Sequence, residues 1–172
     1  MNQLAGQTSP GALRIPRWEF IGLCASLMAL NALAIDIMLP ALQQIGASLG
    51  VEQPNHRQYV ITAYIVAFGV AQLFFGPVSD RFGRRVPLLA GLAIYIAGAF
   101  AATLAPTFEV VLLCRFVQGI GAAATRVIAI SIVRDAFGGR RMAEIMSLIF
   151  MVFMAIPVVA PGLGQLIMLF AE

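Results

Sequence analysis

The chain has 172 residues, of which 60% are hydrophobic and only 11% are charged, and its formal net charge is +3. An ordinary soluble domain is nearer half apolar and a quarter charged, so this composition excludes a soluble globular protein. The mean hydropathy of +0.91 also excludes intrinsic disorder beyond the N-terminal tail. The basic residues do not form one patch, so we expect no nucleic-acid partner.

Five long apolar runs follow one another along the chain. Each is long enough to cross the ~30 Å hydrocarbon core of a lipid bilayer as a helix, which rises about 1.5 Å per residue. None has the alternating polarity of a membrane barrel strand. We therefore predict an all-α membrane protein, a polytopic bundle of five transmembrane helices. The predicted spans are residues 18–40, 58–78, 86–104, 110–133 and 145–169.

The arginines predict how the chain lies across the membrane. All eleven basic residues are arginine, and most lie before the first span, after the second or after the fourth. The opposite side carries only Arg57. Because cytoplasmic loops are enriched in positive charge, we expect a cytoplasmic N-terminus and an external C-terminus in a bacterial-type inner membrane. Residues 1–17 would be a cytoplasmic tail and residues 18–172 the transmembrane domain.

Two charged residues lie at similar depth within predicted spans. Asp36 is about one turn below the outer surface in the first span, and Arg115 has a comparable depth in the fourth. A charge at the bilayer centre costs at least about 2.5 kcal/mol on insertion scales, so each needs a partner or a wet cavity. We predict that these side chains face each other, directly or across water. They would form either a structural ion pair or a proton-coupling site.

A polar face runs along the fourth span. Arg126 follows Arg115 by eleven residues, which places both on nearly the same side of a helix, and Gln118 lies near them. We predict that this face lines a polar substrate cavity. Tyr64 and Gln72 in the second span are candidates for the same wall, although a buried glutamine can equally serve as a contact between helices.

Small residues predict where helices approach closely. Gly119 and Gly121 lie in one short stretch of the fourth span, and Gly69 and Gly76 lie in the second. Residues without bulky side chains let the backbones of membrane helices come together. We therefore expect close contacts at both places.

The fifth span contains a cluster of helix-disrupting residues. Proline removes a backbone hydrogen bond, and in a membrane this is tolerated where protein or a cavity satisfies the freed carbonyl. We interpret the cluster as a hinge or tight seam, with a passive kink as the alternative. Its members are Pro157, Pro161, Gly162 and Gly164.

The sequence carries no pattern for metal, cofactor or covalent chemistry. Its two cysteines, Cys24 and Cys114, lie in different apolar spans, and its single histidine, His56, lies in a loop. A Cys/His metal site or a nucleophile with its base therefore cannot be assembled. We expect no metal, no cofactor and no enzymatic activity.

The connection between the second and third spans has a fixed pattern of glycine and charged residues. From position 76 to position 85 it reads Gly-Pro-Val-Ser-Asp-Arg-Phe-Gly-Arg-Arg. The glycines permit a tight turn, and the arginines can donate charge-assisted hydrogen bonds. This stretch resembles the G-x-x-x-D-R-x-G-R-R signature of major facilitator superfamily transporters. The matching residues are Gly76, Asp80, Arg81, Gly83, Arg84 and Arg85.

Three further segments resemble the same superfamily. Residues 115–121 resemble its R-x-x-Q-G-x-G pattern, residues 36–40 its D-x-x-x-P pattern, and residues 157–164 the bent fifth helix of proton-driven drug antiporters. The Arg134-Asp135 pair is similar to the Bcr/CflA-like drug:proton antiporter subgroup.

The resemblance implies a transporter that exchanges external protons for small amphipathic compounds such as antibiotics. It implies that Asp36 faces the central cavity and that Arg115 takes part in proton coupling. It also implies a conformational latch, in which Asp80, Arg84 and Asp135 form a charge network at the cytoplasmic ends of helices two to four. The latch residues would be Gly76, Asp80, Arg81, Gly83, Arg84, Arg85, Arg134 and Asp135.

Length separates this chain from transporters of that kind. They have twelve spans in two pseudo-symmetric halves with the substrate between them, whereas five spans are predicted here. We expect an incomplete N-terminal domain that lacks the C-terminal half and does not transport alone. The alternative is a five-span structural or regulatory membrane protein that oligomerises or associates with a full-length transporter.

Overall fold

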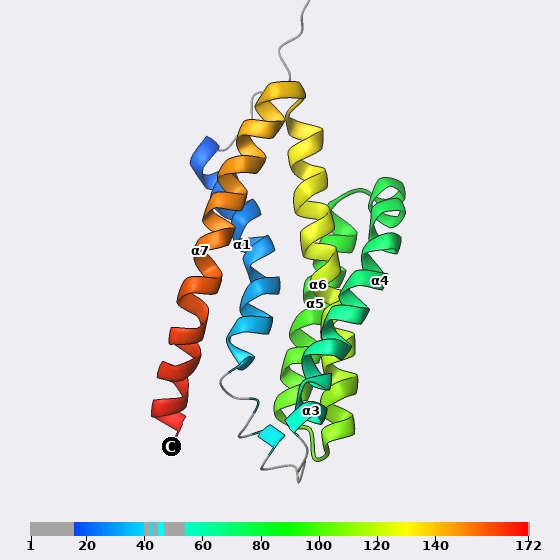
Figure 1. Cartoon of the computed structure of the whole chain (residues 1–172). Helices are drawn as coiled ribbons and strands as arrows, with labels where there is room; N and C mark the ends of the chain where they lie inside the picture. Colours follow the sequence, from blue (N-terminus) through cyan, green and yellow to red (C-terminus); the bar gives the residue numbers. More distant parts are fainter. Residues whose placement is uncertain (1–15, 40–41, 43–44, 47–53, 172) are drawn as a thin grey trace, which may run out of the picture.

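A computed structural model describes residues 16–39, 42, 45–46 and 54–171. Within these residues the chain is helical and contains no strand, which confirms the all-α class (Figure 1). Five helices are long and apolar enough to cross a membrane. The helices are α1 (Arg17–Asp36), the single-turn α3 (Pro54–Arg57), α4 (Tyr59–Phe82), α5 (Arg85–Thr103), α6 (Phe108–Ala136) and α7 (Gly139–Ala171).

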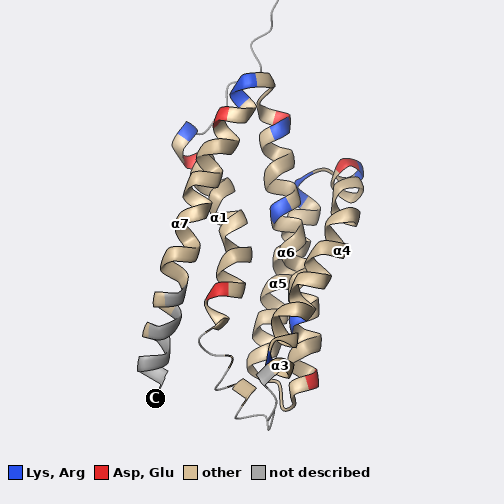
Figure 2. Cartoon of the chain, viewed as in Figure 1, with Lys and Arg blue, Asp and Glu red and all other residues tan. Residues whose placement is uncertain are grey.

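The helices extend beyond the apolar runs where α6 meets α7. Helix α7 begins at Gly139, before the predicted residue 145, and its polar first turns hold an ion pair between Arg140 and Glu144 at 3.7 Å. An apolar run marks only the part of a helix that lies in hydrocarbon, so polar turns outside it escape that signal. Figure 2 shows that many charged residues gather at this end of the bundle.

Helix α6 is the centre of the bundle, with α4 and α5 against it (Figure 1). Its small residues let the helices touch through their backbones. A Cβ atom on Gly119 would collide with the carbonyl oxygen of Tyr64, and one on Gly121 with the backbone nitrogen of Tyr95. The close contacts predicted for the fourth span are therefore present.

The close contact predicted for the second span is wrong. A Cβ atom on Gly69 or Gly76 would have no neighbour within 4 Å. Both glycines lie among exposed apolar side chains such as Leu73 and Phe74, which are 74% and 65% exposed. Such a surface suits lipid, because the hydrocarbon is as apolar as the side chains.

Helices α1 and α7 pack side by side (Figure 1). Buried Cys24 and Met28 of α1 contact a cluster that includes Ile145 and Ile149 of α7, and Val133 of α6 completes it. This cluster ties the α1–α7 pair to the central helix at the end where α6 and α7 are joined.

Helix α7 runs without interruption through its proline and glycine cluster. Pro157 is exposed, and a Cβ atom on Gly162 would meet nothing within 4 Å, so these two positions form no tight seam among the described residues. For Pro161 and Gly164 the structure describes only the helical backbone. A helix can continue through proline in a membrane when local adjustments satisfy the freed backbone groups. A bending role for this cluster stays a prediction.

Candidate functional site

A tight turn joins α4 to α5. It contains Gly83, whose φ of 79° lies in the left-handed region that favours glycine, and Arg84, which directly precedes α5. A side chain at position 83 would strain this turn. The turn brings the Arg84 side chain back over the end of α4 and towards the end of α6.

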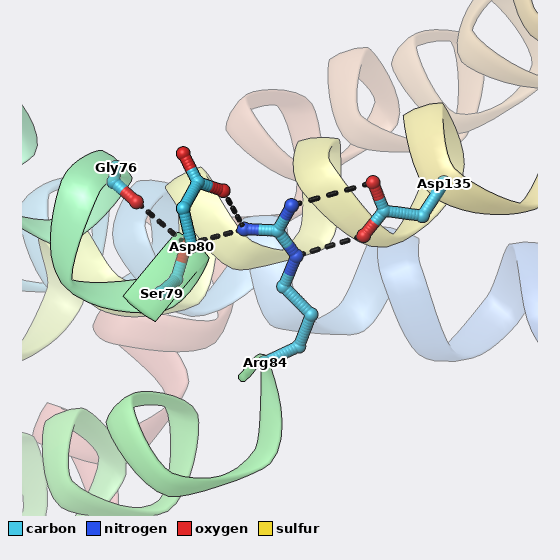
Figure 3. Close-up of polar contacts among 5 residues, drawn as sticks. All are labelled: Gly76, Ser79, Asp80, Arg84 and Asp135. Atoms are coloured by element: carbon cyan, nitrogen blue, oxygen red, sulfur yellow. Dashed lines mark hydrogen bonds and ion pairs between the residues drawn. The ribbon is translucent and has the colours of Figure 1, made fainter. Parts of the chain in front are cut away.

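The Arg84 guanidinium lies between two carboxylates (Figure 3). Its Nη1 donates to Asp80 Oδ1 at 2.6 Å. Its Nε and Nη2 donate to the two carboxylate oxygens of Asp135 at 2.8 and 3.3 Å. The second contact is a bidentate pair, which adds geometric specificity to the charge attraction. The charge network that the resemblance implies among these three residues is therefore present.

The two carboxylates favour the charged form of Arg84. Hydrogen bonds to Asp135 and then to Asp80 raise the pKa of Arg84 above its already high ordinary value. The three side chains are partly exposed, so each pair stabilises the fold only slightly. The network therefore acts mainly by fixing where the α4–α5 turn lies against the end of α6.

Ser79 also belongs to the network, and sequence reasoning missed it. Its buried hydroxyl accepts a hydrogen bond from Arg84 Nη1 at 2.6 Å and donates to the carbonyl oxygen of Gly76 at 2.9 Å. Its place three residues after Gly76 is a usable signal, because a helical serine commonly donates to a carbonyl one turn earlier.

The other latch arginines lie around this network without an ion pair among the described residues. The guanidinium of Arg81 lies 5.4 Å from the ring centre of Phe82. Arg85 is exposed at the first turn of α5, and Arg134 is exposed in the last turn of α6. A cation in the last turn interacts favourably with the helix dipole.

Arg115 and Asp36 do not form the predicted direct contact. Arg115 Nη1 instead donates to Gln118 Oε1 at 3.0 Å and to the carbonyl oxygen of Ala34 at 3.4 Å. The arginine reaches the predicted helix, but a backbone carbonyl of α1 accepts its hydrogen bond in place of the carboxylate. Within the described residues no ion pair or hydrogen bond joins Asp36 to a partner, and contact across water stays a prediction.

Arg115 lines a cavity of about 460 Å³ between α1, α5 and α6. Gln118 lies on the same wall, as predicted, and Tyr95 of α5 contributes a hydroxyl that sequence reasoning missed. That hydroxyl donates to the carbonyl oxygen of Leu30 at 3.2 Å. The remaining lining is apolar, so the cavity is mostly apolar with a few polar groups on one side.

Tyr64 and Gln72 do not line this cavity. Tyr64 is 2% exposed, and its hydroxyl donates to Asn31 Oδ1 at 2.9 Å, which links α4 to α1 inside the bundle. Gln72 is half-buried without a hydrogen-bond partner among the described residues. Tyr64 therefore forms a contact between helices.

Arg126 lies apart from the Arg115 cavity. Its guanidinium is 5.9 Å from the ring centre of Phe68 in α4, a cation–π contact. Arg115 contacts α1 and Arg126 contacts α4, so a single cavity lined by both arginines stays a prediction.

A second hollow of about 320 Å³ lies between α4 and α6 and is lined only by apolar side chains, including Phe74, Phe75 and Phe116. Among the described residues no group of three or more His, Cys, Asp or Glu side chains could hold a metal ion. The hollows and the Arg84 network are therefore the features on which a function can be argued.

Comparison with known proteins identifies the class. The profile of the Major Facilitator Superfamily matches residues 21–171, so the chain belongs to this family of transporters. It is a multi-pass integral protein of the inner membrane and not an enzyme.

Individual relatives are named as multidrug resistance proteins. Multidrug resistance protein MdtL from Escherichia coli (strain K12 / DH10B) is 37% identical over 144 residues, which cover 84% of this chain and 37% of the relative. The same values hold for MdtL from Escherichia coli O139:H28 and from Shigella boydii serotype 18. The matched region thus spans less than half the length of these curated relatives.

Proposed function

We propose that these helices form one wall of a transporter that expels small amphipathic compounds, such as antibiotics, in exchange for external protons. The observation that carries the proposal is the 37% identity to Multidrug resistance protein MdtL, which covers 84% of the chain. The same stretch of chain forms the Arg84 network and the Arg115 cavity.

In this proposal the two conformations of the transporter differ at both sites. The network of Asp80, Arg84 and Asp135 stabilises the outward-open state at the cytoplasmic side. Asp36 takes up the proton. Arg115 modulates the affinity of Asp36 for that proton through the intervening turn of α1. Protonation and drug binding need only favour different states for exchange to be coupled.

We further propose that the N-terminus is cytoplasmic and the C-terminus external. In a complete transporter, the C-terminal half would supply the second wall of the cavity. The distribution of arginines supports this orientation. The alternative function, a five-span protein that regulates a full-length transporter, predicts stable association with that transporter and no exchange activity.

A chimera tests the proposal. In this chimera, residues 1–172 replace the matching segment of Escherichia coli MdtL. A fluorescent drug-like dye is added to the medium outside everted membrane vesicles that contain the chimera. We expect dye uptake that depends on an imposed proton gradient and stops when a protonophore collapses it. A chimera that is inserted and folded but moves no dye, while MdtL itself does, would contradict the proposal.

A further inference from the structure

The Arg115 cavity has a positive charge without a counter-charge. Among the described residues Arg115 is the only charged side chain that lines it, and Asp36 is not part of the lining. The other polar groups on the wall are the Tyr95 hydroxyl and the Gln118 amide. An uncompensated cation inside a membrane protein marks a site where a negative or acceptor group is favoured.

The guanidinium is also incompletely hydrogen-bonded. Nη1 donates to Gln118 and to the Ala34 carbonyl, but Nε is buried and has no hydrogen-bond partner among the described residues. Arginine stays protonated and cannot relieve this by losing a proton. A buried donor without an acceptor is costly, so an incoming acceptor gains more here than at a surface arginine.

The geometry points to a binding site for an amphipathic small molecule that carries a carboxylate or a similar acceptor at one end. The acceptor binds the Arg115 guanidinium, and the apolar body lies against Leu30 and Leu33 of α1 and against Ile37, which directly follows that helix. This inference rests on the proposed function and names its substrate class, which is acidic rather than cationic. The volume of about 460 Å³ lies within the usual range of small-molecule pockets.

Equilibrium binding of two matched probes tests the inference. The purified chain in phosphatidylcholine nanodiscs is titrated by calorimetry with naphthoate and with naphthylmethylamine, which share one ring system and differ in the sign of their charge. We expect naphthoate to bind at least about tenfold more tightly. Equal affinities, or tighter binding of the amine, would overturn the inference without any mutation.

Variants locate the site. Arg115→Gln should remove the preference for naphthoate, whereas Arg140→Gln, which neutralises an arginine that is 95% exposed, should keep it. Loss of the preference in both variants would show a general charge effect and would contradict the inference. If Arg115→Gln does not fold, Leu33→Trp, which fills the cavity beside an unchanged Arg115, should weaken both probes; unchanged binding there would also overturn it.

Failure of this inference can be separated from failure of the proposed function. Binding at equilibrium needs neither a proton gradient nor a second wall, so it stands even if the chimera transports nothing. Conversely, a chimera that exports cationic dyes while naphthoate shows no preference would overturn only the assignment of substrate class.

Discussion

At the scale of single residues, Arg84 shows how one side chain can connect three helix ends. It is held by Asp80 from the end of α4 and by Asp135 from the end of α6, while it directly precedes α5. These contacts are partly exposed, so their effect is on position more than on global stability.

Replacing Asp135 tests this view. Asp135→Asn should lower the free energy of unfolding by less than about 1 kcal/mol, because exposed ion pairs contribute little. It should nevertheless speed amide hydrogen exchange in the turn at Gly83 and Arg84, because the bidentate contact is lost. Arg140→Gln removes an arginine that is 95% exposed and lies outside the network, so it should leave that exchange rate unchanged. A large loss of stability with unchanged exchange would contradict the prediction.

The hydrogen bond between Tyr64 and Asn31 is buried, so its loss should lower the stability of the chain. Tyr64→Phe should destabilise the chain by about 1 kcal/mol, because it leaves the Asn31 amide without its partner. Adding Asn31→Leu should recover much of that loss, since both polar groups are then absent. Unfolding in mixed detergent micelles measures both variants; equal stability of Tyr64→Phe and the original chain would refute the hydrogen bond's role.

At the scale of helices, contact between α5 and α6 depends on the absence of side chains. Gly121→Val should lower the free energy of unfolding by about 2 kcal/mol, because the new atoms collide with the backbone of Tyr95 and the two helices are forced apart. Gly69→Ala in α4 meets nothing within 4 Å and should be neutral or slightly stabilising. The same micelle unfolding assay compares them, and similar losses in both variants would be inconsistent with this packing.

The number of helices able to span a membrane and the all-α fold class were predictable, because the thickness of the bilayer imposes a length on each apolar run. Within the Arg84 network, Asp80 and Arg84 were predictable because they belong to a signature with fixed spacing, and Asp135 because the Arg134-Asp135 pair resembles one transporter subgroup. The partner of Arg115 was not predictable. The depth in the membrane that is inferred from the sequence cannot distinguish the Asp36 carboxylate from a nearby backbone carbonyl of the same helix. Tyr95 was missed for a related reason: a lone tyrosine in an apolar span gives no sign of which cavity it borders.

At the scale of the whole molecule, the described helices leave broad apolar faces and border hollows of about 320 and 460 Å³. A cavity that has only one wall cannot open alternately to the two sides of a membrane. We therefore expect the 172-residue chain alone, reconstituted in vesicles, to show no dye transport under a proton gradient, whereas the chimera with MdtL does. Gradient-dependent transport by the chain alone would contradict this expectation.

We propose that these helices couple proton binding to drug binding through Asp36, and a measurement of drug-driven proton release tests this coupling. Drug is added to purified chimera in weakly buffered detergent solution, and a pH-sensitive dye reports released protons. We expect release by the chimera and by its Arg140→Gln control, and none by Asp36→Asn. Unchanged release from Asp36→Asn, with drug binding intact, would show that Asp36 does not carry the exchanged proton.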